Sequence, residues 1–208
     1  MDKYNNCSKT IAEAFLIIIV LQTIKLLTEK IVTPLVPDNT FSVRMVTAAI
    51  MLTLTIVVYA YARLRKTTLS VFPKPFVKWY IVVTCIAVAL LISSPSNFAG
   101  GYQAIFLAIY SSIITPIYEE ILFRGYLWNR LQRVMSKELY TYLWSILLFT
   151  VWHLGYMLPQ LMNGNWMAVA WKLAAGIGYG AVLGFVRLKT GNCYSTMLLH
   201  GVLNIFMI

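Results

Sequence analysis

The chain has little charge, and acidic residues are especially scarce. Charged side chains make up 12% of its 208 residues and only seven are aspartate or glutamate, whereas 60% of the residues are hydrophobic. A soluble domain usually has about 25% charged and about 45–50% apolar residues. The shortage extends along the whole chain, so it excludes an ordinary soluble domain and indicates a protein that crosses a membrane several times.

Cysteine is scarce as well. Cys7, Cys85 and Cys193 are odd in number, widely separated and without a CxxC spacing, which argues against a disulfide framework. Cys193 is sixteenth from the C-terminus, so it is not a prenylation signal. The net charge of +10 comes from cations clustered between apolar runs. That clustering is typical of membrane orientation signals, and we expect no nucleic-acid partner.

Continuous apolar runs predict membrane-spanning helices, in which each span satisfies its own backbone hydrogen bonds. The first run lacks a small-residue cleavage site, so we interpret it as a retained helix. We predict an all-α transmembrane bundle, with about three spans in residues 1–100 and about four in residues 101–208. The runs are Ile11–Leu27, Val43–Ala62, Phe76–Ile92, Tyr102–Arg133, Leu139–Leu158, Trp166–Leu188 and Tyr194–Ile208.

Lysine and arginine alternate between the connections. They concentrate in residues 63–78, 130–137 and 187–189, and they are absent from the connections that follow the third and fifth runs. The positive-inside rule places the cationic connections in the cytoplasm. We therefore predict a multi-pass protein of the cell membrane, with its N-terminus in the cytoplasm and its C-terminus outside.

Two adjacent carboxylates, Glu119 and Glu120, end the apolar run Tyr102–Tyr118. Charge in such a segment is costly unless it is paired or functional. Glu120 and Arg124 are four residues apart, so they can pair along one helix face. Glu119 is turned about 100° away. The spacing therefore predicts a structural carboxylate at Glu120 and an available one at Glu119.

The chain has only two histidines, His153 and His200, and both lie in apolar runs. Asn204 follows His200 by four residues and shares its helix face. A glutamate and a histidine can act as general base on a water, and a protonated histidine and an asparagine can donate to an oxyanion. Each residue alone is typical of a polar group that joins helices. Together with Glu119 they indicate hydrolysis, without a serine or cysteine nucleophile.

The three motifs Glu119-Glu120-x-x-Phe-Arg124-Gly125, Phe149-x-x-x-His153 and His200-x-x-x-Asn204 resemble the signature of the CPBP family. These are the CAAX prenyl proteases and bacteriocin-processing (Abi) enzymes. The resemblance covers about residues 100–208. It implies an intramembrane glutamate-type endopeptidase that acts on a peptide or a membrane-protein tail.

The resemblance also implies a role for each motif residue. Glu119 and His153 would activate a water, His200 and Asn204 would form the oxyanion site, and Glu120 and Arg124 would support it. That mechanism needs no metal or other cofactor. A zinc alternative stays open, with Glu119, His153 and His200 as ligands and one open position.

The chain departs from the prenyl proteases in one respect. It ends four residues after Asn204, where those enzymes continue into a further helix. We therefore expect a peptide-processing or bacteriocin-immunity role and an unprenylated substrate. One alternative is a non-catalytic immunity or scaffold protein of the same fold. Another is a small transporter, although the matched, interrupted halves of many transporters are not seen.

Two expectations concern geometry. Gly176, Gly180 and Gly184 have the four-residue spacing that lets two helix backbones approach closely, so they predict tight packing. His153 lies about 21 Å into its run at about 1.5 Å per residue. Glu119 reaches that depth only if the fourth run is one long helix, with Arg124 inside the protein.

Overall fold

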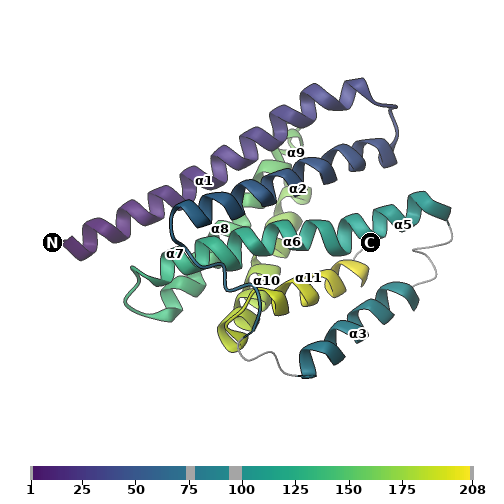
Figure 1. The fold of residues 1–208 in the computed structure, drawn as a ribbon. Coiled ribbons are helices and arrows are strands. Elements are labelled where there is room, and N and C mark those ends of the chain that lie inside the picture. Colours follow the sequence, from purple (N-terminus) through teal and green to yellow (C-terminus); the bar gives the residue numbers. More distant parts are fainter. Residues whose placement is uncertain (1, 74–77, 94–99, 207–208) are drawn as a thin grey trace.

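The computed structural model describes residues 2–73, 78–93 and 100–206 as a bundle of helices, with no strand among those residues (Figure 1). The predicted all-α class is confirmed. The predicted start of the third span at Phe76 lies outside the described residues, as does most of the loop that follows Ser93.

The first two helices form an antiparallel hairpin. α1 (Asp2–Val32) and α2 (Thr40–Leu64) are joined by a 3-10 turn, Thr33–Leu35, and a short extended segment. The connector is rich in proline, which cannot continue a hydrogen-bonded helix. Asn39 then starts α2, because its side chain accepts the backbone N–H of Ser42 at 2.8 Å.

The remaining helices surround one long helix that contains three α-helical parts. These parts are α5 (Gly101–Ile109), α6 (Thr115–Glu120) and α7 (Trp128–Gln132), and π-helical segments at Tyr110–Ile114 and Ile121–Leu127 join them. The other helices are α3 (Lys78–Ser93), α8 (Glu138–Tyr156), α9 (Leu158–Met162), α10 (Trp166–Thr190) and α11 (Tyr194–Phe206).

The long helix confirms the prediction for the fourth run. It is continuous from Gly101 to Gln132 and passes through the middle of the bundle, with α1 and α2 on one side and α11 and α3 on the other (Figure 1). From Tyr118 to Leu131 every residue except Ile121 and Arg130 is buried. Arg124 thus lies inside the protein and not at its edge.

Four helices are long and apolar enough to cross a membrane, so the chain is a membrane protein. They are Asn6–Leu35, Thr40–Leu64, Gly101–Gln132 and Trp166–Thr190, and a shorter apolar helix spans Tyr80–Ser93. The count of seven spans stays a prediction, because the helices after Gln132 other than α10 do not meet the same length and hydropathy criteria within the described residues.

α8 and α10 pack closely through the predicted glycines. A Cβ atom added at Gly176 would lie 3.3 Å from the Cα of Thr150, and one at Gly180 would lie 3.2 Å from the Cα of Ile146. At Gly184 it would lie 2.9 Å from the ring of Tyr142. Backbone contact at this distance leaves no room for a side chain, so the prediction of tight packing is confirmed.

Candidate active site

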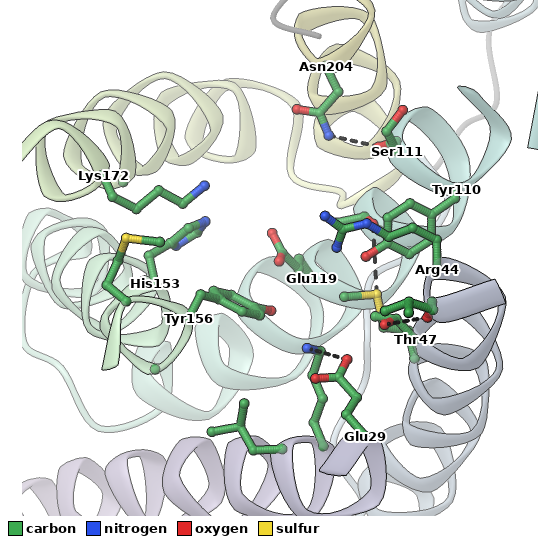
Figure 2. Close-up of a pocket in the computed structure, with 18 of the residues that line it drawn as sticks. Glu29, Arg44, Thr47, Tyr110, Ser111, Glu119, His153, Tyr156, Lys172 and Asn204 are labelled. Carbon is green, nitrogen blue, oxygen red and sulfur yellow. Dashed lines mark hydrogen bonds and ion pairs between the residues drawn. The ribbon is translucent and has the colours of Figure 1, made fainter. Parts of the chain in front are cut away.

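A cavity of about 880 Å³ penetrates the bundle and reaches the predicted site residues (Figure 2). Glu119, His153, His200 and Asn204 all line it, and they come from the long helix, α8 and α11. Residues separated by as much as 85 positions in the sequence, Glu119 and Asn204, therefore meet at one place. Glu120 and Arg124 lie behind this wall and are fully buried.

Glu120 and Arg124 form the ion pair that their spacing predicts. Nη1 of Arg124 lies 3.0 Å from Oε1 of Glu120, and neither side chain is exposed. Arg124 also donates to the carbonyl of Gly180 at 3.4 Å, and its guanidinium lies 4.3 Å from the centre of the Phe149 ring. Pairing and hydrogen bonding make the two charges tolerable in a buried place.

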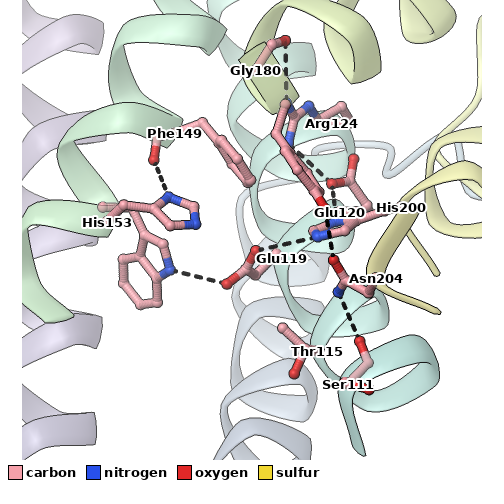
Figure 3. Close-up of polar contacts among 12 residues, drawn as sticks. Ser111, Thr115, Glu119, Glu120, Arg124, Phe149, His153, Gly180, His200 and Asn204 are labelled. Atoms are coloured by element: carbon pink, nitrogen blue, oxygen red, sulfur yellow. Dashed lines mark hydrogen bonds and ion pairs between the residues drawn. The ribbon is translucent and has the colours of Figure 1, made fainter. Parts of the chain in front are cut away.

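His200 is held by the same carboxylate. Its Nδ1 lies 2.9 Å from Oε1 of Glu120, and its Nε2 lies 4.0 Å from Oε2 of Glu119 (Figure 3). A carboxylate paired with an arginine only accepts hydrogen bonds, so Nδ1 carries the hydrogen. Nε2 therefore carries a hydrogen only when the ring is an imidazolium.

Glu119 occupies the position between the two histidines. It is only 3% exposed but lines the cavity, and its Oε1 accepts from the indole Nε1 of Trp152 at 3.3 Å. This contact was not expected from the sequence. Trp152 precedes the motif histidine His153, and that adjacency is the one sequence signal that points to it.

His153 has a defined tautomer as well. Its Nδ1 lies 2.7 Å from the carbonyl oxygen of Phe149, one helical turn earlier. A carbonyl only accepts, so Nδ1–H donates and Nε2 of the neutral ring keeps its lone pair. The ring points toward Glu119 (Figures 2 and 3). The Nε2 lone pair of His153 therefore faces the cavity, where it can accept a hydrogen from a water.

Asn204 is oriented by hydrogen bonds at both ends of its amide. Nδ2 donates to the carbonyl of Ser111 at 2.8 Å, and Oδ1 accepts from the hydroxyl of Tyr179 at 3.1 Å. An asparagine amide has two N–H groups, so the bond to Ser111 uses only one of them. Tyr179 also lines the cavity and was missed by the sequence analysis.

The first π-helical segment explains why the Ser111 carbonyl accepts a side chain. In an α-helix the N–H of Thr115 would bond to the carbonyl of Ser111, but here it bonds to the carbonyl of Tyr110. The next residue, Pro116, has no N–H to offer. The carbonyl of Ser111 is thereby released toward α11, where Asn204 binds it. π-helical turns are frequent at functional sites for this kind of reason.

The second π-helical segment releases a carbonyl in the same way. The N–H of Trp128 bonds to the carbonyl of Phe123 and not to the carbonyl of Arg124, which would be its α-helical partner. Nε of Arg187 donates to the carbonyl of Arg124 at 2.9 Å, and its Nη2 donates to Oδ1 of Asn129 at 3.0 Å. Buried Arg187 therefore connects α10 to the long helix. Its position in a cationic connection gave no sign of this role.

The proposed zinc ligands are Glu119, His153 and His200. Among the residues that the structure describes, no three histidine, cysteine or acidic side chains are grouped closely enough to hold a metal ion. Nδ1 of His200 is already bound to Glu120, so only its Nε2 could serve. The geometry thus offers no assembled ligand set, and the zinc alternative stays a prediction.

A family model described as type II CAAX prenyl endopeptidase Rce1-like matches residues 101–206. The match includes Glu119, His153, His200 and Asn204, and covers just over half of the chain. Searches of curated proteins and of solved structures found no match. The resemblance seen in the sequence is confirmed, and the chain belongs to the Rce1-like family of type II CAAX prenyl endopeptidases.

Proposed function

We propose that the protein is an intramembrane endopeptidase that cleaves a peptide or membrane-protein tail with a water activated by Glu119 and His153. One observation carries this proposal. A buried carboxylate and an imidazole lone pair face the same cavity, while the adjacent carboxylate of Glu120 is occupied by Arg124. The free and the paired carboxylate thus have separate roles.

The reaction begins with a water bound between Glu119 and Nε2 of His153. Glu119 takes a proton from this water while the water oxygen forms a bond to the carbonyl carbon of the substrate. The tetrahedral intermediate then collapses, and the carbon–nitrogen bond breaks. Glu119 returns the proton to the leaving amine, so the carboxylate is regenerated. No covalent enzyme intermediate and no serine or cysteine nucleophile is needed.

His200 and Asn204 stabilise the negative oxygen of that intermediate. Asn204 has an N–H that Ser111 does not use, and His200 donates through Nε2 when its ring is an imidazolium. Removal of one such donor typically lowers the rate about 10²–10³-fold.

The decisive experiment is a comparison of the wild type with Glu119→Gln, which keeps the size of the side chain. The purified proteins are incubated with a peptide library, and new peptide ends are identified by mass spectrometry. We expect cleavage by the wild type and none by the variant. Equal cleavage by the wild type and Glu119→Gln would contradict the proposal.

A cellular readout separates this function from a binding-only role in immunity or scaffolding. If deletion of the gene produces a phenotype, an endopeptidase predicts that Glu119→Gln reproduces the deletion. A variant that restores the normal phenotype while cleaving nothing would favour the binding-only role. Peptide processing and bacteriocin immunity are the functions that the family resemblance suggests for this assay.

A further inference from the structure

The cavity extends from the site toward one end of the bundle only. From Glu119 and His200 it follows the last turns of α1, the first turns of α2 and the end of α8. The turn between α1 and α2 and the short helix α9 lie at this end. We call it the cavity end, and the opposite end the closed end.

The closed end carries most of the basic residues. They occur near the start of α1, in the last turns of α2, α7 and α10, in the connections that follow α2 and α7, and at the start of α3. The described members of this set are Lys9, Arg63, Arg65, Lys66, Lys78, Arg130, Arg133, Lys137, Arg187 and Lys189. Short connections rich in lysine and arginine stay in the cytoplasm, so the closed end is the cytoplasmic end.

The cavity end has few cations, and they share a different feature. Lys25, Lys30, Arg44 and Lys172 all line the cavity. Lys25 is neutralised by Glu29 at 2.8 Å. Within the described part of the chain, neither Arg44 nor Lys172 has a carboxylate at ion-pair distance. These two cations therefore present positive charge to whatever enters.

The positions of these two cations bracket the candidate site. Arg44 lies over the ring of Tyr110, with 5.6 Å between its guanidinium carbon and the ring centre. Lys172 extends toward the cavity beside His153, on the opposite wall (Figure 2). A peptide that enters from the cavity end would pass both side chains before it reaches Glu119. An arginine and a lysine so placed favour a carboxylate.

We propose that the cavity is loaded from the non-cytoplasmic face of the membrane by a peptide segment that carries a carboxylate, and that Arg44 and Lys172 bind this carboxylate. This proposal rests on the proposed function, because a bound peptide is a substrate only if the protein cleaves it. The substrates are chain ends or acidic segments exposed on the outer side. The carboxylate comes either from a C-terminus or from an acidic side chain.

Sidedness is tested by cysteine labelling in cells, which needs no catalysis. In a Cys7→Ala/Cys85→Ala background, Asn163→Cys places a thiol on the exposed connection between α9 and α10, at the cavity end. Ser136→Cys places one on the exposed connection between α7 and α8, at the closed end. We expect a membrane-impermeant maleimide to label the first in intact cells and the second only after lysis. The reverse pattern would overturn the proposal.

Carboxylate binding is tested by fluorescence anisotropy on the purified Glu119→Gln protein in a neutral detergent. The probe is an octapeptide with a neutral dye, two glutamates and a free C-terminus. Its C-terminal amide and its Glu→Gln version distinguish the two carboxylate sources. We expect Arg44→Gln and Lys172→Gln each to weaken binding about tenfold, equivalent to about 1.4 kcal/mol, and Lys189→Gln at the closed end to have no effect.

The outcomes separate the two proposals. If the probe binds equally well to all three variants, or if neither neutral version binds more weakly, carboxylate recognition by the cavity is wrong. If labelling and binding behave as expected but the wild type cleaves nothing, the cavity is an outward-facing binding site and the proposed hydrolysis is wrong.

Discussion

Oε1 of Glu120 lies 2.9 Å from Nδ1 of His200, a residue 80 positions later in the chain. The same oxygen lies 3.0 Å from Nη1 of Arg124. Glu120 therefore holds the histidine in one tautomer while it neutralises the arginine. Both contacts use Oε1 of Glu120, whose side chain is fully buried, whereas Glu119 is the carboxylate that lines the cavity.

This division of roles predicts different consequences for two adjacent substitutions. Glu120→Gln leaves Arg124 buried without its charge partner, a change that typically costs about 3–5 kcal/mol. Glu119→Gln breaks no ion pair with an arginine and should leave thermal unfolding in detergent nearly unchanged. Both variants should lose peptidase activity. Equal destabilisation by the two substitutions would contradict the assignment.

The oxyanion role of Asn204 is tested with Tyr179 as a comparison. Asn204→Ala removes a donor, so kcat should fall about 10²–10³-fold while KM changes little. Tyr179→Phe removes the hydrogen bond that orients the amide, which is worth about 1 kcal/mol, or roughly fivefold in rate. Steady-state kinetics on a cleaved peptide measures both. A larger loss in the tyrosine variant would argue against the assignment.

Alanine substitutions at two glycines of α10, Gly180 and Gly178, should affect stability differently. Gly180→Ala would bring a methyl group within 3.2 Å of the Ile146 backbone and force α8 and α10 apart, which costs about 1–3 kcal/mol. Gly178 has no atom within 4 Å of an added Cβ. Gly178→Ala should be neutral or stabilising by up to about 1 kcal/mol. Thermal unfolding of the two variants in the same detergent makes the comparison.

Metal dependence distinguishes the glutamate–water mechanism from the zinc alternative. We expect activity to survive dialysis against 1,10-phenanthroline, because the proposed steps use only side chains and water. Elemental analysis of the purified protein provides the matching control. Loss of activity that returns on addition of zinc would instead favour Glu119, His153 and His200 as ligands.

Cys193 supplies a pH-dependent prediction in the connection between α10 and α11. Burial raises the pKa of its thiol from an ordinary 9.0 to about 12. Its stabilising contribution is therefore complete below pH 9 and decreases as the pH rises toward 12. At pH 8 a permeable maleimide should label exposed Cys85 in the folded protein and Cys193 only after unfolding. Rapid labelling of Cys193 at pH 8 would show that the thiol is accessible.

Local patterns in the sequence predicted much of the architecture. Apolar runs located the helices, because a span must satisfy its own backbone hydrogen bonds. The four-residue spacing of Glu120 and Arg124 predicted their ion pair, and the spacing of Gly176, Gly180 and Gly184 predicted the contact with α8. Each of these depends on neighbours within one or two helical turns, which the period of the helix places together.

Other features depend on contacts between distant segments, and only the tertiary structure decided them. Trp152 reaches Glu119 across 33 residues, and Asn204 reaches the carbonyl of Ser111 across 93. The π-helical segments that release such carbonyls follow from Pro116 and from packing, and helical periodicity does not reveal them. The sequence by itself thus determined which chemical groups are present. The packing of α8, α10 and α11 on the long helix decided the tautomers of the two histidines, the partners of each site residue and the end at which the cavity opens. These features depend on how whole helices approach one another.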